Sequence, residues 1–217
     1  MTATLSALIL GTYCLLSFLC FSHVRHDGTC GPAKGFLMPL LAGFTLISHF
    51  PVTDPLVFVL IGALLLGGLG DVLLEHPKTY VPGGLSFLAG HILYAMLSVI
   101  QIREAGRLPL IPALLGLLVL FPAIYCQRQL LKAVPRKLLP AVICYSCAIA
   151  CMCLLTFCRF RAVSTASFIL CLTGSCLFVL SDSILAHRFF LHGKGIGVME
   201  TYTLAQALLA IGYGISL

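Results

Sequence analysis

The sequence predicts an all-α fold, a polytopic transmembrane helix bundle of about eight spans in a single domain covering residues 1–217. Of the 217 residues, 60% are hydrophobic and only 9% are charged, and the mean hydropathy is +1.08. A soluble domain is roughly one quarter charged, so this composition excludes one. The apolar residues also fall in long runs separated by short polar breaks, as in helical membrane proteins.

Each apolar run approaches the roughly 20 residues that a membrane-crossing helix needs. The expected spans cover residues 4–22, 35–50, 55–74, 83–102, 108–126, 138–158, 166–187 and 196–216. The first run lacks the basic residues that precede the apolar core of a signal peptide, so we expect it to remain as a span. The second run is the shortest. It contains Pro39, which a membrane helix tolerates when neighbouring helices satisfy the freed carbonyl.

Five of the 11 cysteines fall in the expected span 138–158. Cys144 and Cys147 have the spacing of a metal or redox pair, but no histidine or acid accompanies them in that span. We interpret these cysteines as small apolar packing residues, and we expect neither a disulfide framework nor a metal site.

The charged loops predict the orientation. The first, third, fifth and seventh loops hold Arg25, Lys34, Lys78, Arg128, Lys132, Arg136, Lys137, Arg188 and Lys194. The other loops hold only Arg103, Arg107, Arg159 and Arg161. Because cytoplasmic loops carry the excess of Lys and Arg, both termini should be non-cytoplasmic. The net charge of +6 therefore does not indicate nucleic-acid binding. The membrane could be a bacterial inner membrane or the endoplasmic reticulum.

Two aspartates lie deep in apolar runs, within similar phrases: Leu69-Gly70-Asp71-Val72-Leu73-Leu74 and Leu180-Ser181-Asp182-Ser183-Ile184-Leu185. A carboxylate inside a membrane costs at least about 2–3 kcal/mol, so it usually serves a function. The alternative for Asp71 is that it caps a helix or pairs with a lysine at the interface. Both aspartates come near the cytoplasmic ends of their spans, which predicts one site opening toward that leaflet.

The matching phrases predict two parallel four-helix repeats, residues 1–102 and 108–217. His91 follows Asp71 by 20 residues, and Tyr202 follows Asp182 by the same distance. Lys34 before Pro39 matches Lys137 before Pro140. The alternative is two unrelated helices that end alike.

Each aspartate is followed by a span with polar side chains on one face. His91 and Tyr94 are three residues apart, and Tyr202 and Gln206 are four apart, so each pair shares a helix face. We expect a shared polar cavity, with the first pair beside Asp71 and the second pair beside Asp182. Unrelated packing contacts are the alternative. Glu200, early in the last span, fits either the site or the interface.

Two carboxylates in a water-poor cavity do not ionise independently, and this leaves one as an acid and one as a base. A lipid or small-solute transporter is an alternative, because parallel repeats with polar residues near the midplane also suit transport. An intramembrane aspartyl protease is less well supported. Gly68-Leu69-Gly70-Asp71 and Pro112-Ala113-Leu114 match its phrases, but its Tyr-Asp span should precede Asp71.

Four phrases together resemble the YhhN family of membrane proteins, whose animal members are lysoplasmalogenases. They are Gly70-Asp71-Val72-Leu73-Leu74; Val81-Pro82-Gly83 with Phe87, His91 and Tyr94; Leu180-Ser181-Asp182-Ser183-Ile184-Leu185-Ala186; and Thr201-Tyr202 with Ala205-Gln206. The chain departs from the family pattern at Glu200, where relatives usually have a small polar residue. The spacing from Lys34 to Pro39 is also longer than usual.

The resemblance implies hydrolysis of the vinyl ether bond of a lysoplasmalogen to a fatty aldehyde and glycerophosphocholine or glycerophosphoethanolamine. It implies that Asp71 and Asp182 are catalytic and that no metal or organic cofactor is needed. The partner would be a lysophospholipid-type lipid, with Lys34, Lys78, Lys137 and Arg188 as candidates for its phosphate. The oligomeric state stays open, with a homodimer among the options.

Overall fold

The computed structural model describes residues 2–27, 34–106, 109–192 and 197–217. Its helical elements are α1 (Thr2–Asp27), α2 (Lys34–Ser48), α3 (Leu56–Leu73), η1 (Pro77–Thr79), α4 (Tyr80–Glu104), α5 (Leu110–Cys126), α6 (Arg128–Ala133), α7 (Leu139–Cys158), α8 (Thr165–Leu191) and α9 (Val198–Gly214). No strand forms within these ranges. The all-helical prediction is confirmed, and each of the eight expected spans coincides with one long helix.

Five of these helices, namely α1, α3, α4, α7 and α8, are long and apolar enough to cross a membrane. The chain is therefore an integral, multi-pass membrane protein. Helix α2 and the apolar part of α5 are shorter than a full span. The number of eight spans stays a prediction. The short helix α6 was not expected, and it lies between the fifth and sixth expected spans.

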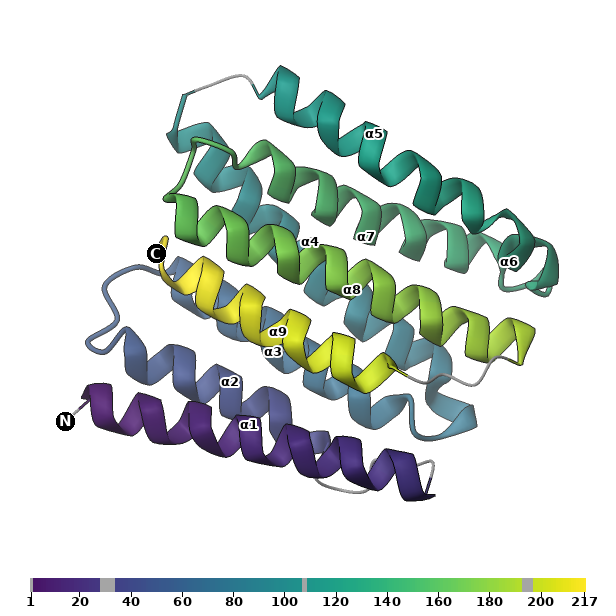
Figure 1. Ribbon diagram of the computed structural model, residues 1–217, viewed down its shortest axis with the longest axis horizontal. Coiled ribbons are helices and arrows are strands. Elements are labelled where there is room, and N and C mark those ends of the chain that lie inside the picture. The colour runs from purple at the N-terminus through teal and green to yellow at the C-terminus, as the bar shows by residue number, and fades with distance from the viewer. Residues whose placement is uncertain (1, 28–33, 107–108, 193–196) are drawn as a thin grey trace.

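The helices form one bundle with a central group of four and a pair on each side (Figure 1). Helices α3 and α4 pack together, as do α8 and α9, and α9 also packs against α3. On one side α2 packs against α3 and α9, with α1 outside it. On the other side α7 packs against α4 and α8, with α5 outside it. The two sides are arranged alike, because one pair of helices covers each flank of the central four.

The bundle places apolar side chains on its outside, and its largely apolar interior also holds polar side chains. Phe18, Leu114 and Phe121 are exposed, as expected for residues that face lipid. Asp71, His91 and Gln206 are buried in the middle of the bundle. Because lipid cannot hydrogen-bond to them, these polar groups must find partners inside the protein.

One loop charge is not exposed. Arg159 follows the end of α7, as expected from the sequence, but it caps the C-terminus of that helix and is completely buried. Its Nε donates to Gln101 Oε1 at 2.8 Å, and one Nη donates to Ser167 Oγ at 2.9 Å. Helix C-termini carry partial negative charge, which favours a cation there. Arg107, Lys194 and the side chain of Arg25 lie outside the described residues.

Candidate active site

Asp71 lies in the last turn of α3 and is almost fully buried, with 2% of its side chain exposed. Its Oδ1 is 3.2 Å from the ammonium Nζ of Lys34, the first residue of α2. Its Oδ2 accepts a 2.8 Å hydrogen bond from the hydroxyl of Tyr202 on α9. Both carboxylate oxygens are therefore satisfied inside the bundle. Pairing with a lysine, one of the alternatives for Asp71, is confirmed; Asp71 is buried in this pair, and Lys34 keeps 16% of its side chain exposed.

A chain of hydrogen bonds continues from Asp71 through α9 to α4. Gln206 Nε2 is 3.5 Å from the Tyr202 hydroxyl, and Gln206 Oε1 accepts a 2.7 Å bond from the Tyr94 hydroxyl. A glycine on α3 makes room for this chain. A Cβ on Gly67 would lie 2.9 Å from Gln206 Nε2 and 3.3 Å from the Tyr202 hydroxyl. The expected polar cluster therefore forms around Asp71, but its members come from α9 as well as α4.

Asp182 lies in the second half of α8, with 14% of its side chain exposed. The hydroxyl of Tyr145 on α7 donates a short hydrogen bond to its Oδ2. His91 Nε2 is 3.7 Å from the same oxygen and 3.1 Å from the Tyr145 hydroxyl. Because the single proton of the phenol points to Asp182, His91 Nε2 must be the donor to the phenol oxygen. The histidine thus supports the tyrosine that holds Asp182.

The structure corrects the expected pairing of partners with aspartates. The sequence assigned His91 to Asp71 and Tyr202 to Asp182, because each follows that aspartate along the chain. Instead Tyr202 contacts Asp71 and His91 contacts Asp182. The reason is packing, since α9 lies against α3 as well as α8. Each of the two spans therefore serves the aspartate of the other half of the chain.

The two carboxylates do not touch. Among the described residues, no hydrogen bond or ion pair joins Asp71 to Asp182. The ring of Phe178 on α8 stands between their partners, 4.7 Å from the His91 ring and 5.5 Å from the Tyr202 ring, in edge-to-face contacts. The site consists of two carboxylate centres separated by an aromatic group.

Tyr145 was not predicted from the sequence, because it lies among cysteines in its span and because the match of Lys34 with Lys137 gives a different offset between the halves. A signal was available in the spacing. Asp182 follows Asp71 by 111 residues, and Tyr202 follows His91 by the same 111 residues. The residue that stands 111 positions after Lys34 is Tyr145. This constant offset identifies Tyr145 as the counterpart of Lys34.

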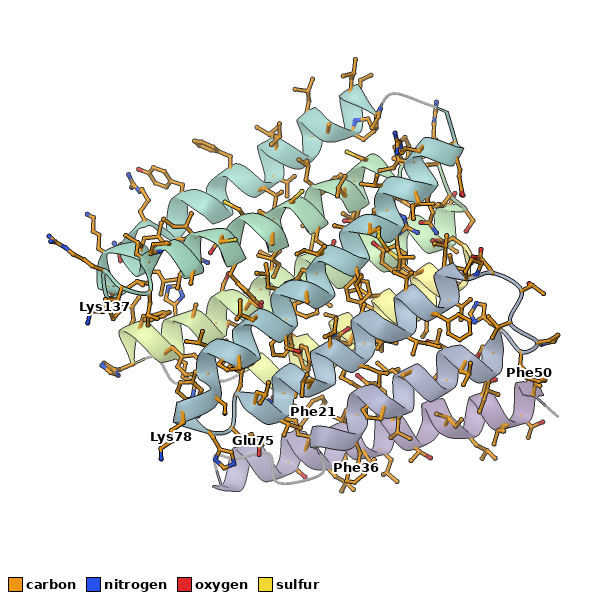
Figure 2. The ribbon with its side chains drawn as sticks, turned by 180° about the vertical axis from the view of Figure 1, so that it is seen from behind. Phe21, Phe36, Phe50, Glu75, Lys78 and Lys137 are labelled. Carbon is orange, nitrogen blue, oxygen red and sulfur yellow. The ribbon has the colours of Figure 1, made fainter. Side chains whose placement is uncertain are left out.

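The remaining site candidates differ in their exposure. Glu200 is in the first turn of α9 and is partly buried. It comes two residues before Tyr202, so its side chain leaves the helix on nearly the opposite side. Lys78, Lys137 and Arg188 are exposed. Figure 2 shows Lys78 and Lys137 at one end of the bundle and Phe50 at the other.

A bundle of apolar helices with two carboxylate centres inside it defines a polytopic α-helical membrane protein. Among the described residues, no group of three or more His, Cys, Asp or Glu side chains could hold a metal ion. The chain belongs to the YhhN family, whose sequence model matches residues 32–213. This range contains every residue of both carboxylate centres.

Curated relatives support the assignment. The chain is 36% identical to lysoplasmalogenase TMEM86B of Sus scrofa over 153 residues, which are 69% of this chain. It is 31% identical to lysoplasmalogenase TMEM86B of Homo sapiens over 156 residues, also 69% of this chain. The chain spans 61% of the length of each of these relatives. No solved structure matches the chain.

Proposed function

We propose that this protein is a lysoplasmalogenase, which hydrolyses the vinyl ether bond of a lysoplasmalogen to a fatty aldehyde and a glycerophospho-alcohol. The observation that carries the proposal is the pair of aspartates inside the bundle, Asp71 buried and Asp182 mostly buried, each accepting a hydrogen bond from a tyrosine of a neighbouring helix. Family membership and the similarity to two proteins named lysoplasmalogenase support it. The substrate is a single-chain lipid, and its polar head group would lie at the membrane surface.

The chemistry of the bond requires one acid and one negative charge. A carboxylic acid protonates the alkene carbon that does not carry oxygen, and the π electrons form the new C–H bond. The other alkene carbon becomes an oxocarbenium ion, which a nearby carboxylate stabilises. Water then adds to this carbon and returns a proton to the acid. The hemiacetal hydroxyl then loses its proton and forms the C=O bond of the aldehyde, while the C–O bond to glycerol breaks and the glycerol oxygen takes up a proton to become a free hydroxyl.

Asp71 and Asp182 are the residues proposed for these two roles, and Lys34, Tyr94, Tyr202, Gln206 and His91 support them. A role of Lys34 in binding the lipid phosphate is less well supported, because its ammonium is engaged by Asp71. The exposed bases Lys78, Lys137 and Arg188 remain the proposed contacts for the phosphate.

The enzymatic test is mass spectrometry of purified protein incubated with a lysoplasmalogen. Matched lipids with a 1-acyl or a 1-alkyl chain serve as substrates that lack the vinyl ether. We expect aldehyde only from the vinyl ether lipid. Asp71→Asn and Asp182→Asn should each lower aldehyde release by about 10²–10⁴-fold, the usual contribution of acid–base catalysis.

Asp54→Asn is the matched control, because Asp54 only accepts a hydrogen bond from the Leu56 backbone at a helix N-terminus. It should keep near-normal turnover. Near-normal turnover by either of the other two variants would remove the catalytic assignment. Transbilayer movement of intact lipid without aldehyde release would instead favour the transporter.

The orientation proposed from the loop charges places Lys78 and Lys137 on the cytoplasmic side and both termini on the other. Both lysines are exposed and lie at the same end of the bundle (Figure 2). A membrane-impermeant amine reagent should modify both lysines from the cytoplasmic face of sealed vesicles and neither from the opposite face. Permeabilised vesicles give the full extent of modification. Modification of the two lysines from opposite faces would contradict the proposed orientation.

A further inference from the structure

The two carboxylate centres are built to one plan. We define the Asp71 half-site as Asp71, Lys34 and Tyr202, and the Asp182 half-site as Asp182, Tyr145 and His91. Each aspartate contacts one side chain from the helix that packs before it, Lys34 on α2 or Tyr145 on α7. Each also contacts one side chain from the last helix of the other half, Tyr202 on α9 or His91 on α4. Equivalent members are 111 residues apart.

These matched contacts support the two parallel four-helix repeats, residues 1–102 and 108–217. The packing agrees with them. Helix α2 packs on α9 in one half, and its counterpart α7 packs on α4 in the other. The half-sites therefore occupy equivalent places in the bundle. What differs between them is the chemistry of the residues at those places.

The Asp71 half-site is built for a negative charge. The Lys34 ammonium is 3.2 Å from one carboxylate oxygen, and the Tyr202 hydroxyl donates to the other at 2.8 Å. An opposite charge and a donated hydrogen bond both favour the ionised form of a carboxyl group. A neutral Asp71 would leave the mostly buried ammonium of Lys34 without its counter-ion, which is costly in a protein interior.

The Asp182 half-site has Tyr145 where the other half-site has Lys34, and His91 where the other has Tyr202. Among the described residues, no lysine or arginine forms an ion pair with Asp182, and its closest donor is the neutral phenol of Tyr145. His91 directs Nε2 toward the phenol oxygen, at 3.1 Å, and not toward the carboxyl group, at 3.7 Å. Asp182 therefore lacks the ammonium that favours the ionised form of Asp71, and ionisation of a mostly buried carboxyl group, here 14% exposed, is costly without such a partner.

The residue one helical turn before each aspartate also differs between the half-sites. Gly67 on α3 lets the Gln206 amide approach the Asp71 half-site. The residue 111 positions later is Phe178, whose ring packs against His91 at 4.7 Å. The same ring also packs against Tyr202 at 5.5 Å, so both half-sites border an apolar ring and only the Asp71 half-site has the Gln206 amide as well.

We propose that the two equivalent half-sites carry different protonation states, with Asp182 as the proton donor of the hydrolysis and Asp71 as the permanently ionised carboxylate. This division of roles rests on the proposed function. Tyr145 and His91 are positioning residues: the phenol occupies Oδ2 of Asp182, which leaves Oδ1 to carry the transferable proton. The O–H bond at Oδ1 breaks as the C–H bond of the substrate forms. The attacking water later returns a proton to the same carboxylate.

The test is infrared spectroscopy of the full-length purified protein at neutral pH, with aspartate labelled with ¹³C at its carboxyl carbon. The label identifies the C=O stretch of a protonated aspartic acid by its isotope shift. Wild-type protein should show one such band. Asp182→Asn should remove it, and Asp71→Asn should leave it in place.

Two tyrosine variants provide a matched pair that keeps both aspartates. Tyr145→Phe removes the hydrogen bond to Asp182, so the band should move to higher frequency, and turnover should fall by about 10- to 100-fold, less than for loss of the acid itself. Tyr202→Phe removes the equivalent hydroxyl from the Asp71 half-site and should leave the band unmoved. This pair also decides the question if Asp182→Asn fails to fold.

The outcomes separate this inference from the proposed function. Loss of the band in Asp71→Asn, loss in both aspartate variants, or no protonated aspartic acid in the wild type would overturn the division of roles, even if aldehyde is released. A band that depends on Asp182 and Tyr145 in a protein that releases no aldehyde would confirm the protonation states, and it would overturn the donor role together with the proposed hydrolysis.

Discussion

At the scale of single residues, the ion pair between Lys34 and Asp71 carries a large desolvation cost. Taking a carboxylate and an ammonium out of water costs several kcal/mol for each ion, as an order-of-magnitude figure. The pair offsets this cost only through its geometry, in which Asp71 accepts from Lys34 and Tyr202 at once. Removing one partner leaves the other charge buried and uncompensated.

Lys34→Met should therefore lower the free energy of unfolding by roughly 3–5 kcal/mol, the usual loss when one member of a buried pair is removed. The double variant Lys34→Met with Asp71→Asn should recover most of this loss, because no buried charge remains. Chemical unfolding in detergent micelles measures both. Lys78→Met, at an exposed position, serves as the control and should change stability little. Equal stability of the single and double variants would show that the pair is not charged.

Close approach of helices around the site depends on glycines at a few positions. Gly67 on α3 leaves the space that Gln206 and Tyr202 occupy. Gly174 on α8 does the same for α9, since a Cβ there would lie 3.0 Å from the backbone oxygen of Ala205. Such small residues let membrane helices pack tightly where no hydrophobic force distinguishes one helix partner from another.

Gly67→Ala tests this packing at the level of two helices. The added methyl group would lie 2.9 Å from the Gln206 amide nitrogen, so the hydrogen-bonded chain from Tyr202 to Tyr94 must shift. We expect a fall in turnover of about 10-fold or more, as small displacements of catalytic groups commonly cause. Gly43→Ala in α2 is the matched control, because nothing lies within 4 Å of its added Cβ. Equal activity of the two variants would show that the chain of bonds tolerates displacement.

The helices themselves could be predicted from the sequence, and their partners could not. Long apolar runs form helices because lipid offers the backbone no hydrogen bonds, so the eight long helices follow from composition. Which faces meet is a different question, because neighbouring helices and lipid tails are similarly apolar. The polar residues Asp71, Asp182, His91 and Tyr202 were found from their cost in the membrane. Their exchange of partners depends on helix packing that no apolar pattern encodes.

At the scale of the whole bundle, Arg159 connects four helices at the end away from the carboxylates. From α7 it reaches Gln101 on α4, Ser167 on α8 and, at 3.1 Å, Ser216 beyond the end of α9. Its guanidinium also lies 4.3 Å over the ring of Tyr213. Ser167 and Asp182 are separated by about 22 Å along α8, at 1.5 Å for each residue of a helix. Arg159 therefore acts on the stability of the bundle and not on the chemistry.

Arg159→Met should leave the oxygens of Gln101, Ser167 and Ser216 with fewer partners, at about 1–3 kcal/mol for each buried group that stays unsatisfied. Arg159→Lys should restore only part of the loss, because an ammonium cannot reproduce the planar fork of a guanidinium. Thermal unfolding in detergent should show the highest stability for the wild type, a lower one for Arg159→Lys and the lowest for Arg159→Met. Turnover for each folded molecule should stay near that of the wild type. Normal stability with lost turnover would place Arg159 in the catalytic machinery instead.

The exchange of partners between the halves also bears on how such a site can arise. A four-helix unit on its own would hold an aspartate but not the side chain that completes the centre, because that side chain comes from the other unit. Two separate, identical units would therefore have to dimerise, and they would form two identical centres. When the two units are joined in one chain, each can change its sequence independently. One unit can then have a lysine where the other has a tyrosine at the equivalent position. Chemical asymmetry between acid and base is thus available to a fused pair and denied to a symmetric dimer.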